Sequence, residues 1–105
     1  MRYRFAERAF SDLRSIAAYT VREWGSEQCE RYLAALETCC QQLAGDPHLG
    51  RACDQISPGL LRQEQGKHVV FYRLRPYGIR VIAILHERML PQRHLAGADD
   101  EDDSD

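Results

Sequence analysis

Two kinds of hydrophobic periodicity divide this chain. From about Glu7 to Gly45, apolar residues recur at helical spacing, and after residue 60 they gather in short runs typical of strands. Gly25 separates two helical stripes, so we expect it to end the first helix, with Ser26 capping the second. The first stripe contains Leu13, Ile16, Ala17, Thr20 and Trp24, and the second contains Cys29, Tyr32, Leu33, Leu36, Cys40 and Leu43. Gly45-Asp46-Pro47 ends the second helix, and the one-glycine connection predicts an antiparallel helical hairpin.

The last part of the chain predicts a β-hairpin. The runs His68 to Leu74 and Ile79 to Leu85 are rich in β-branched and aromatic residues, and Arg75-Pro-Tyr-Gly78 between them suits a tight turn. Arg2 to Phe5 and Leu60 to Gln65 are further strand candidates. The second of these is polar, so we expect it to be short or to lie at a sheet edge.

The order β-α-α-β-β-β predicts an α+β fold, a helical hairpin packed on a small antiparallel sheet. The residues expected in the core, themselves or through immediate neighbours, are Leu13, Ile16, Trp24, Leu33, Leu36, Phe71, Val81 and Ile82.

The composition shows that positive and negative charge are unevenly distributed along the chain. The chain has 105 residues and a net charge of −2, but six of its 16 acids lie in residues 99–105. Without them, 14 basic residues face 10 acidic ones, a balance of +4, and Lys67 is the only lysine. We therefore predict one domain over residues 1–95 and an acidic, disordered tail over residues 96–105. The arginines suit an acidic partner or nucleic acid, or else simply form a solvated surface.

Other features of the sequence limit the chemistry. No apolar run approaches the ~20 residues of a membrane span and no signal peptide is visible, so we expect a cytoplasmic protein without a membrane partner. The spacing of Cys29, Cys39, Cys40 and Cys53 suits neither a disulfide frame nor a metal, so reduced structural thiols are expected, with Cys53 the most reactive. We predict no metal site and no cofactor.

The predicted hairpin also contains a recognisable sequence motif. Gly66-Lys-His-Val-Val-Phe-Tyr-Arg73, a turn, and then Val81-Ile-Ala-Ile-Leu-His-Glu-Arg-Met89 resemble the ParE toxins of bacterial toxin–antitoxin modules, within the RelE/ParE superfamily. Tyr19 to Gly25 and Glu30 to Glu37 are similar to the helices of the same family. The resemblance covers residues 2 to 95, and the strand from Leu60 to Gln65, with polar Gln63 and Gln65, departs from it.

The resemblance implies a function without catalysis. A ParE-like toxin inhibits DNA gyrase by stabilising its DNA-cleaved state, and a ParD-like antitoxin with a ribbon-helix-helix domain neutralises it. Operator DNA would be bound only through that antitoxin. The alternatives are a RelE-like ribosome-dependent mRNA interferase and a co-repressor that only binds the antitoxin. For an interferase, His86, Arg88 and His94 are the late acid–base candidates, but the chain lacks a lysine cluster and a tyrosine after Tyr77.

Two sets of arginines are candidate interaction residues. We expect Arg22, Arg31, Arg73 and Arg80 to pair with acids of the antitoxin. For the toxic target we expect Arg51, in the loop from Asp46 to Gly59, and Arg88 and Arg93, in the run from His86 to Leu95. The alternative for that run is that Met89, Leu90 and Leu95 pack back onto the helices.

Overall fold

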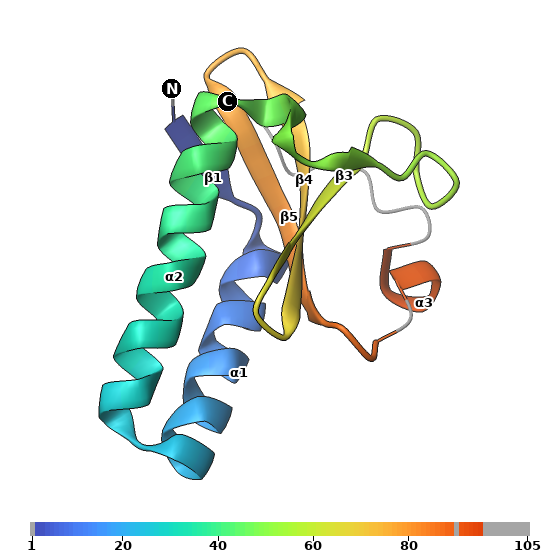
Figure 1. The fold of residues 1–105 in the computed structure, drawn as a ribbon. Coiled ribbons are helices and arrows are strands. Elements are labelled where there is room, and N and C mark those ends of the chain that lie inside the picture. Colours follow the sequence, from blue (N-terminus) through green and yellow to red (C-terminus); the bar gives the residue numbers. More distant parts are fainter. Residues whose placement is uncertain (1, 90, 96–105) are drawn as a thin grey trace.

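The computed structural model describes residues 2–89 and 91–95, and the predicted tail over residues 96–105 lies outside the described residues. Figure 1 shows the elements, which are β1 (Arg2–Phe5), α1 (Glu7–Trp24), α2 (Ser26–Gly45), the 3-10 helix η1 (Pro47–Leu49), β2 (Arg51–Ala52), β3 (Leu61–Gln65), β4 (His68–Arg75), β5 (Gly78–His86) and α3 (Pro91–Leu95). The predicted order of strands and helices is confirmed. The structure adds η1 and β2 within the predicted loop, and α3 after the hairpin.

One sheet connects all five strands in the order β1-β5-β4-β3-β2. Strands β2 to β5 are antiparallel, whereas β1 pairs with β5 in parallel, so the sheet is mixed rather than antiparallel throughout as predicted. Gly78 permits this pairing, because a Cβ at its φ of 145° would collide with the carbonyl oxygen of Arg2. Strand β2 pairs only with Leu61 and Arg62, so the rest of β3 forms a sheet edge, in line with its polar sequence.

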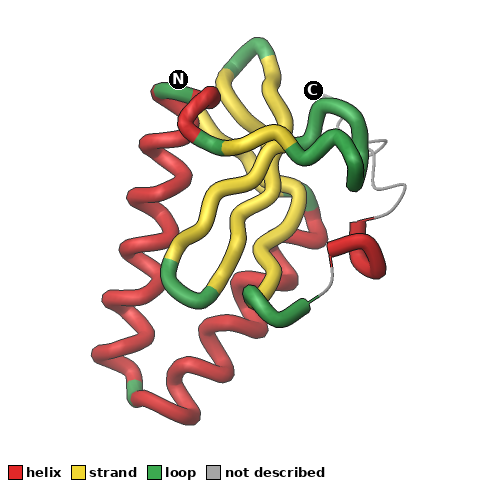
Figure 2. Tube along the Cα trace, turned by 45° about the vertical axis from the view of Figure 1, so that its right-hand side comes forward, coloured by secondary structure: helices red, strands yellow, loops and turns green. Residues whose placement is uncertain are grey.

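The sheet has an apolar cluster on each face, and Figure 2 shows the two long helices on one side of the strands. The α1–α2 hairpin covers one face, and its cluster includes Ile16, Leu36, Leu43, Val70, Tyr72, Val81 and Ile84. The loop after β2 and helix α3 supply the other, whose members include Cys53, Leu60, Phe71, Ile82, Ala83, Leu85 and Leu95. Five of the predicted core residues are confirmed, namely Ile16, Leu36, Phe71, Val81 and Ile82, while Leu13 and Leu33 are partly buried at the margin.

Trp24 is the error in the predicted core, because its side chain is 70% exposed. Helices α1 and α2 are longer than the sheet that they cover, and their connection extends past the ends of the strands (Figure 1). Trp24, in the last turn of α1, therefore has no sheet beneath it. Gly25, with a φ of 91°, ends α1 as predicted, but it is also the residue that precedes α2, so Ser26 is the first helical residue rather than the cap.

A β-bulge changes the register in the middle of the β4–β5 hairpin. Tyr72 lies opposite Val81, but Phe71 lies opposite Ala83, so Ile82 is the extra residue. Ile82 and Ala83 consequently both join the cluster on the face opposite the helices. The same shift places His68 directly opposite His86 at the far end of the hairpin.

All four cysteines are free and buried, which confirms the expectation of reduced structural thiols. The prediction that Cys53 is the reactive one was wrong. Its side chain is fully buried, its Sγ lies 3.4 Å from the Leu60 carbonyl oxygen, and burial raises the pKa of its thiol. Burial, with the nearby Cys39 and Glu37, also raises the pKa of Cys40 to about 12.

Candidate functional site

The larger hollow of the molecule, the helix–hairpin groove, lies between the α1–α2 hairpin and the ends of β4 and β5. Its volume is about 830 Å³. Its lining includes Asp12, Ser15, Ile16, Tyr19, Thr20 and Trp24 of α1, Gln28 and Tyr32 of α2, and Lys67, His68, Ile84, His86, Glu87, Arg88 and Met89 of the hairpin and its flanks. Aromatic and charged side chains thus meet in one depression, a composition suited to binding a peptide or another protein.

One wall of this groove is aromatic and exposed. Tyr19 is 54% and Trp24 is 70% exposed. The Arg22 guanidinium lies 5.6 Å from the centre of the Tyr19 ring, within the range of a cation–π contact. Large exposed aromatic side chains with a neighbouring arginine are enriched at the energetic centres of protein interfaces.

The inner end of the groove contains a cluster of titratable side chains from three elements. Tyr32 of α2 places its Oη 2.5 Å from Nδ1 of His68 in β4. The rings of His68 and His86 meet edge to face with their centres 5.3 Å apart. The Lys67 backbone N–H also donates a hydrogen bond of 3.0 Å to the Tyr32 hydroxyl oxygen. This network fixes α2 to the end of the hairpin.

Burial determines the protonation of this cluster. Removal from water, reinforced by the neighbouring His86, lowers the pKa of His68, although Asp12 and Glu87 act in the opposite direction. Burial raises the pKa of the Tyr32 hydroxyl, against a hydrogen bond from the Lys67 backbone. Both side chains are therefore neutral at pH 7.

Asp12, in the lining of the groove, binds the part of β5 that β1 does not cover. One carboxylate oxygen of Asp12 accepts a hydrogen bond of 2.9 Å from the Ile84 backbone N–H. Ile84 lies beyond the last β1–β5 pair, Phe5 and Val81, so its N–H has no acceptor in β1. The Asp12 carboxylate provides that acceptor instead. Arg8, one turn earlier in α1, donates to both oxygens of the same carboxylate.

A second hollow, the β1 groove, lies between β1 and the two helices and is almost entirely apolar. Its volume is about 370 Å³, and its lining includes Tyr3, Phe5, Leu13, Ala17, Leu33 and Leu36. Arg14 and Glu37 supply its charged groups, and the Tyr3 hydroxyl donates a hydrogen bond of 3.2 Å to Glu37. An apolar groove beside a helical hairpin is a surface on which an amphipathic helix can dock.

The structure does not bring together the four arginines expected at the antitoxin interface. Arg22 and Arg31 lie on the helical hairpin, paired with Glu23 and Glu27 respectively. Arg73 and Arg80 are cross-strand neighbours in β4 and β5, on the sheet face opposite the helices. Arg73 donates to the Pro58 carbonyl oxygen and the Ser57 hydroxyl, each at 2.6 Å, in the loop on that face.

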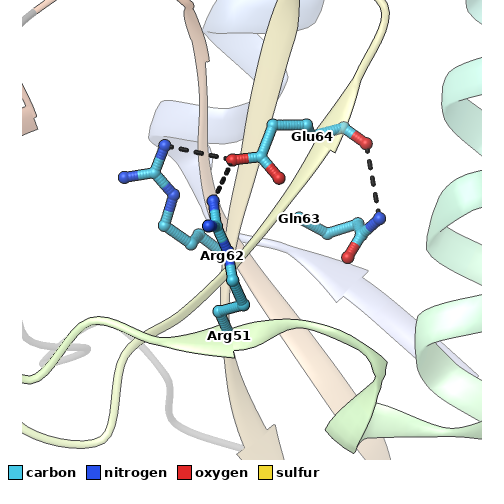
Figure 3. Close-up of polar contacts among 4 residues, drawn as sticks. All are labelled: Arg51, Arg62, Gln63 and Glu64. Atoms are coloured by element: carbon cyan, nitrogen blue, oxygen red, sulfur yellow. Dashed lines mark hydrogen bonds and ion pairs between the residues drawn. The ribbon is translucent and has the colours of Figure 1, made fainter.

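The arginines expected at the toxic surface are also dispersed. Arg51 in β2 pairs with Glu64, which Arg62 contacts as well at 3.2 Å (Figure 3). Arg88 lines the helix–hairpin groove, and Arg93 lies exposed in α3. Leu95 is buried and Met89 is partly buried in the same apolar cluster, so both residues pack back onto the domain. They do so on the sheet face opposite the helices, so the predicted packing onto the helices was wrong, and Leu90 lies outside the described residues.

The Arg51–Glu64–Arg62 contacts fix the edge of the sheet where β2 meets β3. Partial burial alone would raise the pKa of the Glu64 carboxyl, but a backbone hydrogen bond and the charges of Arg51 and Arg62 outweigh it, and the pKa is lowered. Glu64 is therefore charged at neutral pH, and it offsets part of the positive charge that Arg51 would offer to a partner.

Tyr32 and His68 are the site residues that the sequence did not reveal. Tyr32 fitted the apolar stripe of the second helix, and His68 marked only the start of a strand. A pairing argument from the two-residue turn would have placed His68 opposite Leu85, because the bulge at Ile82 is not visible in the sequence. Among residues 2–89 and 91–95, no group of three or more metal-ligating side chains is present, and no helix there is long and apolar enough to cross a membrane.

Known proteins resemble this chain in sequence and in fold. The family described as ParE toxin of type II toxin-antitoxin system, parDE, matches residues 3–91. Toxin ParE1 of Mycobacterium tuberculosis is 39% identical over 95 residues, which are 90% of this chain and 97% of that protein. Toxin ParE1 of Caulobacter vibrioides is 37% identical over 95 residues, 89% of this chain and 96% of that protein. Toxin ParE of Escherichia coli is 39% identical over 90% of this chain and 92% of its own length.

A solved structure described as a chromosomal ParDE TA system from P. aeruginosa has the same fold, with a TM-score of 0.69. It is 18% identical and covers 82% of this chain and 95% of its own. The sequence matches extend from β1 to the start of α3 and thus include both grooves. This chain belongs to the ParE toxin family of type II toxin–antitoxin systems.

Proposed function

We propose that this protein poisons DNA gyrase, by holding the enzyme in its DNA-cleaved state, and that a ParD-like antitoxin neutralises it. The observation that carries this proposal is the family match over residues 3–91, together with 37–39% identity to toxins of that name over almost their whole length. The protein then acts by binding rather than by catalysis. Because gyrase and the antitoxin are cytoplasmic, we place the protein in the cytoplasm.

The grooves support docking of the antitoxin on the helix side of the molecule. The β1 groove offers apolar side chains to an amphipathic helix, and Arg14 lies at its rim. The helix–hairpin groove adds the exposed rings of Tyr19 and Trp24. Arg22 and Arg31 lie on the same hairpin and are placed to pair with acids of the antitoxin. Arg73 and Arg80 would be reached only by an antitoxin segment that passes around the sheet to its other face. We propose that the antitoxin carries a ribbon-helix-helix domain and that the complex binds operator DNA only through this domain.

For gyrase contact we propose Arg51, Arg88 and Arg93, which are exposed and lie on elements outside the helical hairpin. Their charges are not needed for the core, because Met89 and Leu95 supply the packing of this region. Arg51 has Glu64 as a neighbour, so its contribution to a partner would be smaller than that of Arg88 or Arg93.

A direct assay tests the proposal. Purified protein, freed of antitoxin, is incubated with gyrase and plasmid DNA, and in parallel with translating ribosomes and mRNA. We expect loss of supercoiling and an increase in cleaved DNA after detergent treatment, with the mRNA intact. Unchanged gyrase activity at saturating protein would reject the proposal.

The Tyr32–His68–His86 cluster is the observation that favours the second candidate, a ribosome-dependent mRNA interferase. The imidazoles of His68 and His86, with ring centres 5.3 Å apart, and the neighbouring Lys67 and Arg88 are residue types suited to proton transfer and to binding a phosphate. If mRNA is cleaved, a His86→Ala variant should lose about a hundredfold or more in rate. A gyrase poison would lose activity in that variant only if His86 touches the enzyme.

A further inference from the structure

A row of arginines crosses the sheet on the face opposite the helical hairpin. Arg4 of β1 lies in register with Arg80 of β5, and Arg80 lies in register with Arg73 of β4. Arg75 follows Arg73 by two residues, so it projects from the same face. These four residues, Arg4, Arg73, Arg75 and Arg80, are called the arginine row below.

The side of the sheet on which the row lies is fixed by the residues around it. Ile79 and Val81, on either side of Arg80, belong to the cluster beneath the helices, so Arg80 projects to the other side. Arg73 bonds to Ser57 and Pro58 of the loop on that side. Strands β1, β4 and β5 contain no aspartate or glutamate. On this face β3 contributes Glu64, which pairs with Arg51 and Arg62. The guanidinium groups of the row give this part of the face a charge complementary to that of an acidic segment.

The chain contains such a segment close by. Residues 99–105 carry six acids, Asp99, Asp100, Glu101, Asp102, Asp103 and Asp105. The segment follows α3, whose last residue, Leu95, is 1% exposed and is anchored in the same apolar cluster as Phe71, on the face that carries the row.

The chain after Leu95 is long enough for the acidic segment to reach the arginine row. Arg73 follows Phe71 by two residues, or about 7 Å of strand, and neighbouring strands are spaced by about 4.8 Å. The four steps from Leu95 to Asp99 reach at most about 14 Å, and the ten steps to Asp105 reach at most about 36 Å. The acidic segment can therefore reach every member of the row without displacing Leu95.

We propose that the arginine row is the docking surface for the acidic segment 99–105 of the same chain. The segment supplies carboxylates in series, and the guanidinium N–H groups of the row donate paired hydrogen bonds to their oxygens. An acidic partner that uses Arg73 or Arg80 must first displace this segment. The inference does not depend on gyrase or on any other cellular target.

The side-chain resonances of arginine in nitrogen-15-labelled full-length protein provide the first test. The native protein is compared with a variant in which the five aspartates of the segment are changed to Asn and Glu101 is changed to Gln. We expect the Nε–Hε shifts of the arginine row to change, and those of Arg14, Arg22 and Arg31 on the helices to stay. Salt at about 1 M, where the Debye length is about 3 Å, should move the native shifts toward those of the variant. Unchanged row resonances, or equal changes on the helices, would overturn the proposal.

A second test removes charge from the row instead. The full-length variant Arg4→Gln/Arg75→Gln changes the two members at the ends of the row and leaves the buried Arg80 in place, and Arg22→Gln/Arg31→Gln is the matched control on the helices. Backbone order parameters of residues 99–105 should be near 0.85 in the native protein and the control, and should fall below about 0.6 in the row variant. Values below about 0.6 in all three proteins would mean that the segment does not dock. Equal values near 0.85 in all three would mean that it docks elsewhere.

Discussion

The side chain of Leu36 should be among the most costly to truncate. It is 2% exposed and lies at the centre of the cluster between the helices and the sheet. Leu36→Ala should lower the free energy of unfolding by about 2–5 kcal/mol, because a cavity remains where the side chain was. Urea denaturation followed by circular dichroism measures this. Trp24→Ala, at an exposed position, is the control and should change stability by no more than about 0.5 kcal/mol. Equal losses in the two variants would contradict the assignment of the core.

The buried histidine His68 should make stability depend on pH. Its folded-state pKa is below the ordinary value of about 6.5, so the unfolded chain binds a proton more readily than the folded one. The free energy of unfolding should therefore be at its full value above pH 6.5 and decrease as the pH falls through the lowered folded-state pKa. His68→Asn, which retains a polar atom near the position of Nδ1, should flatten this decrease between pH 7.5 and 5. The exposed His48→Asn is the control, and an identical pH profile for native protein and His68→Asn would refute the role of this imidazole.

For single residues, the sequence predicted burial correctly where burial follows from helical periodicity. It failed where burial depends on how far the sheet extends or on how a loop folds. Ile16 and Leu36 lie on a helical stripe over the sheet and are buried as expected. Trp24 continues the first stripe, but no pattern in the sequence shows where the sheet beneath it stops. Cys53 lies in the predicted loop from Asp46 to Gly59 and was expected to be the most reactive cysteine, yet the loop folds inward and its thiol is fully buried against Leu60.

At the scale of elements, the two long helices, the four longer strands and the turn of the hairpin were predictable because each has local signals, whereas η1, β2 and α3 were not predicted. Gly25 marked the helix connection and Pro76 with Gly78 marked the turn. The parallel pairing of β1 with β5 was not predictable, since it depends on contacts between the two ends of the domain. The bulge at Ile82 was not predictable either, and with it the pairing of His68 with His86 remained hidden.

The parallel pairing gives Gly78 a role that a turn glycine does not usually have. Gly78→Ala places a methyl group against the Arg2 carbonyl at a φ of 145°, so it should lower the free energy of unfolding by more than about 1 kcal/mol. Thermal melts compare it with Gly45→Ala at the end of α2, where a Cβ has nothing within 4 Å. The control should leave stability unchanged or raise it by up to about 1 kcal/mol. A melt of Gly78→Ala that matches the native protein would contradict the close approach of β1.

On the scale of the whole molecule, antitoxin binding and toxicity should be separable, because the arginines proposed for each lie on different elements. The variant Arg51→Gln/Arg88→Gln/Arg93→Gln should abolish growth arrest in cells, since it removes the proposed target contacts. It should stay folded and still bind the cognate antitoxin, measured by calorimetry, with at most a reduced affinity because Arg88 lines the helix–hairpin groove. Full toxicity of this folded variant would exclude the proposed surface.

The reciprocal variant addresses the antitoxin. Arg22→Gln/Arg31→Gln should still arrest growth when expressed alone. Its association with the antitoxin, followed by stopped-flow fluorescence of Trp24, should be slower and less sensitive to salt than that of the native protein, because exposed charges act mainly on the rate of encounter. An association rate that does not vary with salt in the native protein would argue against any electrostatic part in recognition.

The pairing of β1 with β5 has a consequence for the time at which the protein becomes active. Strand β1 is the first of the five strands of this sheet in the sequence, and its partner β5 starts only at Gly78, so the sheet cannot be completed until β5 has been made. At about 5–20 residues per second, synthesis of the intervening stretch takes about 4–15 seconds. During that interval the apolar faces of α1 and α2 have no sheet to cover them. We therefore expect the protein to become toxic only after β5 has been synthesised, so that an antitoxin already present can bind it as it folds.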